Sequence, residues 1–123
     1  MPGAFIPLTS GDGFSFQAYH VAPQGVRKGG LIVIQEIFGV NDDIRAVADD
    51  FAAHGFEVLA PSMYDRVLPG FALSHDGADI AYAVQIAQKN GVDNAIRDIG
   101  ACVKFLGPRG KVFITGYCYG GSM

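Results

Sequence analysis

The sequence feature that most constrains the fold is the pattern Gly-x-Cys-x-Gly at residues 116–120, directly after the apolar run 112–114. An apolar run that ends in this pattern predicts a buried β-strand followed by a nucleophile elbow, a sharp strand-to-helix turn that presents one side chain above the sheet edge. Gly116 and Gly120 fit such a turn because a Cβ atom at either position would collide with neighbouring backbone. The side chain that the turn presents is that of Cys118.

Two interpretations of Cys118 follow from this pattern. At the first turn of a helix, the backbone N–H groups and the positive end of the helix dipole favour a thiolate, so Cys118 would be a reactive nucleophile. Alternatively, the cysteine is a small buried hydrophobic residue at a strand–turn–helix junction. Both interpretations are open at this point.

Length and composition limit the class of protein. At 123 residues, half of them apolar and 17% charged, the chain is at most one globular domain, residues 1–123. A net charge of −3 with no concentration of Lys or Arg argues against nucleic acid or an anionic membrane as partner. Two cysteines and no signal-peptide pattern at the start predict a cytoplasmic location. The longest aliphatic run, residues 31–34, is too short to cross a bilayer.

The chain alternates strand and helix patterns. Residues 3–10 and 14–21 flank a glycine-containing turn and predict an antiparallel hairpin, and residues 31–34 predict a strand that is buried on both faces, as in a parallel sheet. Asn41 is a suitable N-cap for a helix that runs to about His54, and a strand at 56–60 follows. The predicted unit is strand–helix–strand.

Two more helices are expected before the elbow. Their apolar positions are Ile80, Val84 and Ala87 in the first, and Val92, Ile96, Ile99, Val103 and Leu106 in the second. Cys102 lies beside the second stripe, so we interpret it as a core residue. The order predicts an α/β fold, a mostly parallel sheet with an N-terminal antiparallel hairpin and helices on both faces in three layers.

The predicted strands direct several polar residues to one edge. Ligands of open α/β sheets bind beyond the carboxyl ends of the strands, and the loops 35–40, 61–75 and 116–120 leave those ends. Glu36 would be the carboxylate nearest to Cys118, and the backbone N–H groups of Ile37 and Tyr119 could together hold an oxyanion. Glu36 can also be a solvated strand-end residue or part of a cap.

Three segments together carry the pattern of a known family. Residues 35–41 read Gln-Glu-Ile-Phe-Gly-Val-Asn, residues 60–64 read Ala-Pro-Ser-Met-Tyr with Pro-Gly at 69–70, and residues 116–121 read Gly-Tyr-Cys-Tyr-Gly-Gly. These segments resemble the dienelactone hydrolases, the carboxymethylenebutenolidase-type members of the α/β-hydrolase superfamily. They occur in the family's order and spacing, and the similarity runs from about residue 10 to the last residue.

The resemblance implies a site and a reaction. Cys118 would be the nucleophile that attacks a small lactone or ester, Ile37 and Tyr119 would supply the oxyanion-hole amides, and Glu36 would hydrogen-bond the resting thiol and help it to become a thiolate. Tyr82 matches, more weakly, a tyrosine that contacts the substrate. The family uses no metal and no organic cofactor.

The chain also departs from the family pattern. The family's catalytic acid and histidine follow the elbow, whereas His20, His54 and His75 all precede Cys118 and the sequence ends at Met123. We therefore expect an α/β-hydrolase-type sandwich that stops just after the elbow, the N-terminal part of one domain about twice as long. Such a piece should be inactive and should expose the edge of the strand at 112–114, through which it could self-associate.

Two other functions are alternatives to the hydrolase. The first is a non-catalytic binding or assembly module that keeps the elbow as an element of the fold. The second is nucleotide binding through the glycines of residues 116–121. Two features argue against it: the glycine spacing is not Gly-x-Gly-x-x-Gly, and no Lys-Ser/Thr pair follows. The rate at which Cys118 reacts with thiol reagents distinguishes the module from the hydrolase.

Overall fold

The structure is a computed structural model that describes residues 3–35, 39–68, 72 and 80–116. Within them, strands and helices alternate as the sequence predicts. The elements are β1 (Gly3–Thr9), β2 (Ser15–Val21), β3 (Gly29–Ile34), α1 (Asp42–Ala53), β4 (Phe56–Pro61), α2 (Ile80–Asn90), α3 (Val92–Leu106), the short 3₁₀ helix η1 (Gly107–Arg109) and β5 (Val112–Gly116).

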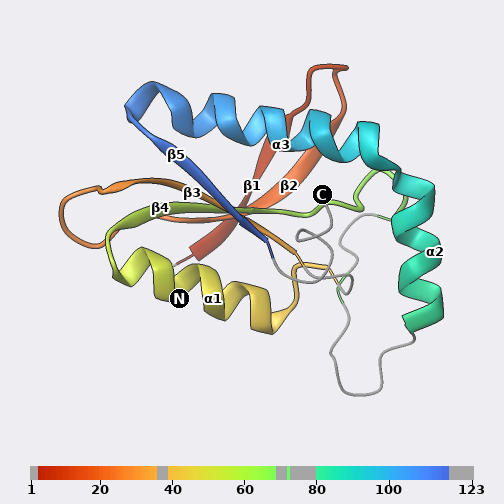
Figure 1. Ribbon diagram of the computed structural model, residues 1–123, viewed down its shortest axis with the longest axis horizontal. Coiled ribbons are helices and arrows are strands. Elements are labelled where there is room, and N and C mark those ends of the chain that lie inside the picture. Colours follow the sequence, from red (N-terminus) through yellow and green to blue (C-terminus); the bar gives the residue numbers. More distant parts are fainter. Residues whose placement is uncertain (1–2, 36–38, 69–71, 73–79, 117–123) are drawn as a thin grey trace.

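The described strands form one sheet in the order β1-β2-β4-β3-β5 (Figure 1). Strands β4, β3 and β5 are parallel neighbours, and β1 and β2 form the antiparallel hairpin. Strand β2 then joins β4 in an antiparallel pairing. The predicted hairpin and the predicted parallel sheet are both confirmed, with one further antiparallel pairing between them.

Helices cover the two faces of the sheet, with α1 on one side and α3 on the other (Figure 1). Strand β3 is buried on both faces: Leu31 and Val33 belong to the core under α1, whereas Ile32 and Ile34 belong to the core under α3. This alternation is what a strand between two helical layers requires. The predicted three-layer arrangement is therefore confirmed.

Helix α1 forms as its capping residues predict. The Oδ1 atom of Asn41 accepts a hydrogen bond from the N–H of Ile44 at 3.1 Å, which satisfies one of the free donors of the first turn. Gly55 follows the helix with φ of +100°, a conformation that favours glycine. Ile44, together with Ala48 and Ala52, faces the sheet and is buried.

The apolar stripe predicted for α3 is largely wrong. Val92, Ile96 and Val103 are exposed, and the buried face carries Ala95, Asp98, Cys102 and Leu106. The prediction missed this face because an aspartate is normally excluded from a core. Here a charged partner accompanies Asp98 into the interior.

Helix α2 differs from its prediction in a similar way. Its fully buried apolar side chains include Ala83 and Ile86, whereas Val84 and Ala87 of the predicted stripe are half-buried. Together with Met63 and Tyr64, the two buried residues form a third small core at the end of the sheet. This core joins α2 to the loop that follows β4.

Strand β5 lies at one edge of the described sheet, and the prediction that it is buried is wrong for this chain. Phe113 pairs with Leu31 and Ile114 pairs with Ile32, so these two side chains point to opposite faces. Phe113 is 47% exposed and Ile114 is 56% exposed. In the described part of the chain, neither face has a helix that covers β5 fully.

Candidate active site

The parallel strands β4, β3 and β5 bring three chain segments to the same edge of the sheet. In the register between β3 and β5, Ile34 lies opposite Gly116. Glu36 and Cys118 each follow this pair by two residues in their own segments. Cys118, Glu36, Ile37 and Tyr119 themselves lie outside the described residues, so the described strands fix where their segments begin.

Gln35 fixes the start of the segment that follows β3. Its side chain is fully buried, and its Oε1 atom accepts a hydrogen bond from the backbone N–H of Met63 at 2.9 Å. The bond joins the end of β3 to the loop after β4. Its Nε2 atom is buried with no hydrogen-bond partner among the described residues. No role was predicted for Gln35 from the sequence, although its position as a polar residue directly after an apolar strand is a signal for one.

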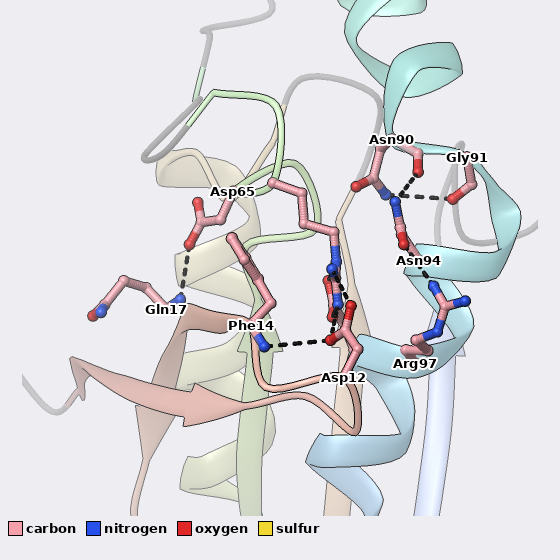
Figure 2. A network of polar contacts seen from close by, with 10 residues as sticks. Asp12, Phe14, Gln17, Asp65, Asn90, Gly91, Asn94 and Arg97 are labelled. Carbon is pink, nitrogen blue, oxygen red and sulfur yellow. Dashed lines mark hydrogen bonds and ion pairs between the residues drawn. The ribbon is translucent and has the colours of Figure 1, made fainter.

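The loop after β4 is fixed by hydrogen bonds to β2. Ser62 donates its hydroxyl to Asp65 Oδ1 at 2.7 Å, and Asp65 Oδ2 accepts the backbone N–H of Gln17 at 2.8 Å. The backbone N–H of Ser62 donates to the carbonyl of Gln17 at 2.8 Å. The contact between Asp65 and Gln17 is seen in Figure 2. Residues 62–65 are therefore an ordered part of the edge.

Arg66 ties this loop to the hairpin turn and to α3. Its guanidinium lies 2.7 Å from Asp12 Oδ2 and 2.9 Å from Asp98 Oδ1, and its charged carbon is 4.6 Å from the centre of the Phe14 ring. Figure 2 shows the network around Asp12 and Phe14. The hydrogen bonds to Asp12 and then Asp98 raise the pKa of Arg66, and the bond from Arg66 holds the pKa of Asp12 well below its usual range.

Cys102 is a core residue, as predicted. It is fully buried under α3, and burial together with the nearby Asp98 carboxylate raises the pKa of its thiol to about 12. A thiol with such a pKa is uncharged near neutral pH and is a poor nucleophile. Cys102 therefore provides an internal comparison for Cys118.

The remaining side chains that the sequence singled out are a tyrosine and three histidines. Tyr82 lies on α2 and is 42% exposed. His20 Nε2 lies 2.9 Å from Glu57 Oε2. His54 is the C-cap residue of α1, and α1 leads into the start of β4, at the end of the sheet opposite the candidate site. His75 lies outside the described residues.

No three His, Cys, Asp or Glu side chains among the described residues gather in an arrangement that could hold a metal ion. None of the described helices combines the length and the hydropathy that are needed to cross a membrane.

Comparison with known proteins decides the family. The sequence model of the dienelactone hydrolase family matches residues 16–123. The chain belongs to this family. The resemblance to dienelactone hydrolases and the α/β-hydrolase-type fold are thus both confirmed.

Individual members of the dienelactone hydrolase family match over most of the chain. Carboxymethylenebutenolidase from Pseudomonas putida is 29% identical over an alignment 123 positions long, which covers 96% of this chain and 52% of that protein. A putative carboxymethylenebutenolidase from Azospirillum brasilense is 39% identical over 89 residues, 72% of this chain and 38% of that protein. The crystal structure of a putative dienelactone hydrolase from Klebsiella pneumoniae superposes with a TM-score of 0.75 at 28% identity, covering 96% of this chain and 52% of that one. The chain spans about half the length of these relatives.

Proposed function

We propose that a full-length protein containing this chain hydrolyses small cyclic enol-lactones or related esters, with the thiolate of Cys118 as nucleophile. The observation that carries this proposal is the register of the sheet. Ile34 and Gly116 lie opposite each other, so the segments with Glu36 and Cys118 leave neighbouring parallel strands at the same edge. Membership of the dienelactone hydrolase family supports the reaction class.

In the proposed mechanism, the Cys118 sulfur attacks the carbonyl carbon, and the N–H groups of Ile37 and Tyr119 stabilise the oxyanion. The tetrahedral intermediate collapses with cleavage of the ring C–O bond, and the enolate oxygen leaves and takes up a proton. Water then hydrolyses the thioester and restores the thiol, with a histidine from the rest of the protein as general base. Glu36 hydrogen-bonds the resting thiol and assists its ionisation.

The described residues support this chemistry by fixing the ends of the segments that carry it. The Gln35–Met63 hydrogen bond joins the loops after β3 and β4, and Asp65 anchors the second loop to β2. A nucleophile and its oxyanion donors must be held close to their productive geometry before substrate binds, and rigid segment ends serve that purpose.

We also propose that these 123 residues are the N-terminal part of a single domain. The exposed Phe113 and Ile114 on opposite faces of β5 support this, because a complete sandwich would cover both. The half-length match to relatives supports it as well. Without that cover, we propose that the chain self-associates through the edge of β5.

On this proposal the catalytic acid and histidine lie in the rest of the domain, so the isolated 123-residue chain should show little or no turnover. Initial rates with para-nitrophenyl acetate, compared with the rate for a free cysteine at the same pH, measure this. Hydrolysis at rates normal for an esterase by the isolated chain, or a stable monomer in analytical ultracentrifugation, would contradict the proposal that the domain is incomplete.

Thiol labelling tests the role of Cys118. In the full-length protein, iodoacetamide near pH 7 should label Cys118 at least about 100-fold faster than Cys102, because the thiolate reacts and burial keeps Cys102 protonated. Loss of esterase activity should follow the labelling of Cys118, as read by peptide mass analysis. Labelling of Cys118 no faster than a free cysteine would favour the non-catalytic module. The proposal places the protein in the cytoplasm, where reducing conditions keep such a thiol free.

A further inference from the structure

A small cavity lies between the hairpin turn and α3, away from the proposed nucleophile. It has a volume of about 230 Å³, and the residues that line it come from the turn and from one face of the helix. They are Thr9, Ser10, Gly11, Arg97, Gly100, Ala101 and Lys104. The volume is below the roughly 300–1,000 Å³ of sites for drug-sized ligands, so a small occupant fits.

One polar group that lines the cavity, the Ser10 hydroxyl, has no hydrogen-bond partner among the described residues. Ser10 is 4% exposed, and its hydroxyl is buried. Buried polar groups in native structures are nearly always paired, so an unpaired hydroxyl beside a cavity indicates a missing partner. Ser10 uses its backbone groups in the turn, through Phe14 and Gly13, which leaves the side chain for another contact.

Two cations flank the same cavity. Arg97 and Lys104 lie seven residues apart on α3, about 10 Å along the helix axis, with the small residues Gly100 and Ala101 between them. In the described part of the chain, neither cation forms an ion pair with a carboxylate, and Arg97 donates one hydrogen bond, to Asn94 Oδ1 at 2.7 Å (Figure 2). The nearby Asp12 is already paired with Arg66. The cavity is therefore locally positive in a chain whose net charge is −3.

We infer that this cavity binds the phosphate group of a small phosphate monoester. A tetrahedral dianion accepts hydrogen bonds from several directions, which suits an arginine, a lysine and a serine hydroxyl placed around one space. A planar carboxylate would be satisfied by the arginine alone. Gly11 and Gly100 leave room for the organic part, since an added Cβ atom at either position would meet no atom within 4 Å.

The test is a titration of the isotope-labelled full-length protein with glycerol phosphate at constant ionic strength, followed by NMR. Amide shifts should concentrate at Ser10, Gly11, Gly100 and Ala101. Inorganic phosphate should shift the same amides, and acetate should bind more weakly than either. Shifts concentrated elsewhere, or equal binding of acetate, would overturn the assignment.

Variants sharpen the test. Lys104→Gln should weaken binding about tenfold and Ser10→Ala about fivefold, because they remove a charged and a neutral hydrogen bond. Gly100→Gln should abolish binding by filling the cavity, and glutamine is a better helix former than glycine, so α3 is retained. The matched control is Lys89→Gln, which removes a lysine from the last turn of α2 just as Lys104→Gln does from α3. Equal weakening by both lysine variants would show general charge attraction and overturn the site.

Ser10 and Lys104 also separate this cavity from a second one at the junction of α2 and α3. That second cavity shares Arg97 but is lined otherwise by residues 90–94, which include Asp93. Binding that survives both Ser10→Ala and Lys104→Gln would therefore place the anion elsewhere. The outcome is independent of Cys118 and of the proposed hydrolase activity.

Discussion

Replacing Cys118 by alanine in the full-length protein should reduce kcat/KM for ester hydrolysis by about 10⁶-fold, the loss expected when a hydrolase loses its covalent nucleophile. The proposed oxyanion donors at Ile37 and Tyr119 are backbone groups, so the variant keeps them and should retain a trace of catalysis over water. Initial rates with a dienelactone and with para-nitrophenyl acetate measure the loss.

Cys102→Ala is the matched control for this prediction. Cys102 lies in the core under α3, where a thiol with a pKa of about 12 takes no part in chemistry near neutral pH. The variant should keep kcat/KM and lose only a modest part of the free energy of unfolding, about 1 kcal/mol, through the small cavity left behind. Equal loss of activity in both variants, or none in Cys118→Ala, would reject Cys118 as the nucleophile.

Arg66→Met should lower the free energy of unfolding by about 3–5 kcal/mol, because it leaves the buried carboxylate of Asp98 without its partner. Asp98 is 1% exposed, so water cannot replace the lost contacts. The substitution also removes the stacking of the guanidinium on Phe14 and the link to the hairpin turn. Urea denaturation of the full-length protein with and without the substitution measures the difference.

Two controls separate the buried charge from general effects of losing an arginine. Arg45→Met breaks an ion pair with Asp42, a highly exposed residue, and should cost less than about 1 kcal/mol. The double variant Arg66→Met/Asp98→Leu should recover part of the loss, since no unpaired charge remains in the interior. A double variant no more stable than Arg66→Met would show that packing, and not charge, dominates at this position.

The pH dependence of the free energy of unfolding tests the contact between Arg66 and Asp12. The folded pKa of Asp12 lies below its usual value, so its contribution is present above about pH 4 and is lost as the pH falls through the lowered folded value. In Arg66→Met the largest part of this contribution, the hydrogen bond from Arg66, is absent at every pH, whereas the bond from the backbone N–H of Phe14 remains. The difference in stability between the two proteins should therefore shrink as the pH falls below about 4.

The sequence predicted the elements that depend on local signals. Asn41 and Gly55 set the limits of α1 through a side-chain cap and a left-handed turn, and both act over a few residues. The apolar run of β3 likewise predicted a strand buried on both faces. The residues that produce each of these signals are neighbours in the sequence, so tertiary contacts did not alter the predicted elements.

The sequence pattern did not indicate the buried charges, because each of them depends on a distant partner. Asp98 lies inside the core because Arg66, 32 residues away, pairs with it. Glu57 is buried in β4 because Arg27 and His20 both reach it at 2.9 Å. No local pattern contains these pairs.

For the candidate site, the sequence by itself determined the residue types and their order: a cysteine in a Gly-x-Cys-x-Gly turn and a Glu-Ile pair after an earlier strand. Only the tertiary structure decided that the two segments start side by side. The pairing of β3 with β5 places Ile34 opposite Gly116, although the two residues are 82 positions apart in the sequence. Only the tertiary structure, too, brought Ser10 to the face of α3 that carries Arg97 and Lys104. Hydrogen bonds between strands and packing between layers join residues that are far apart in the sequence, and a local sequence pattern does not show which distant residues meet.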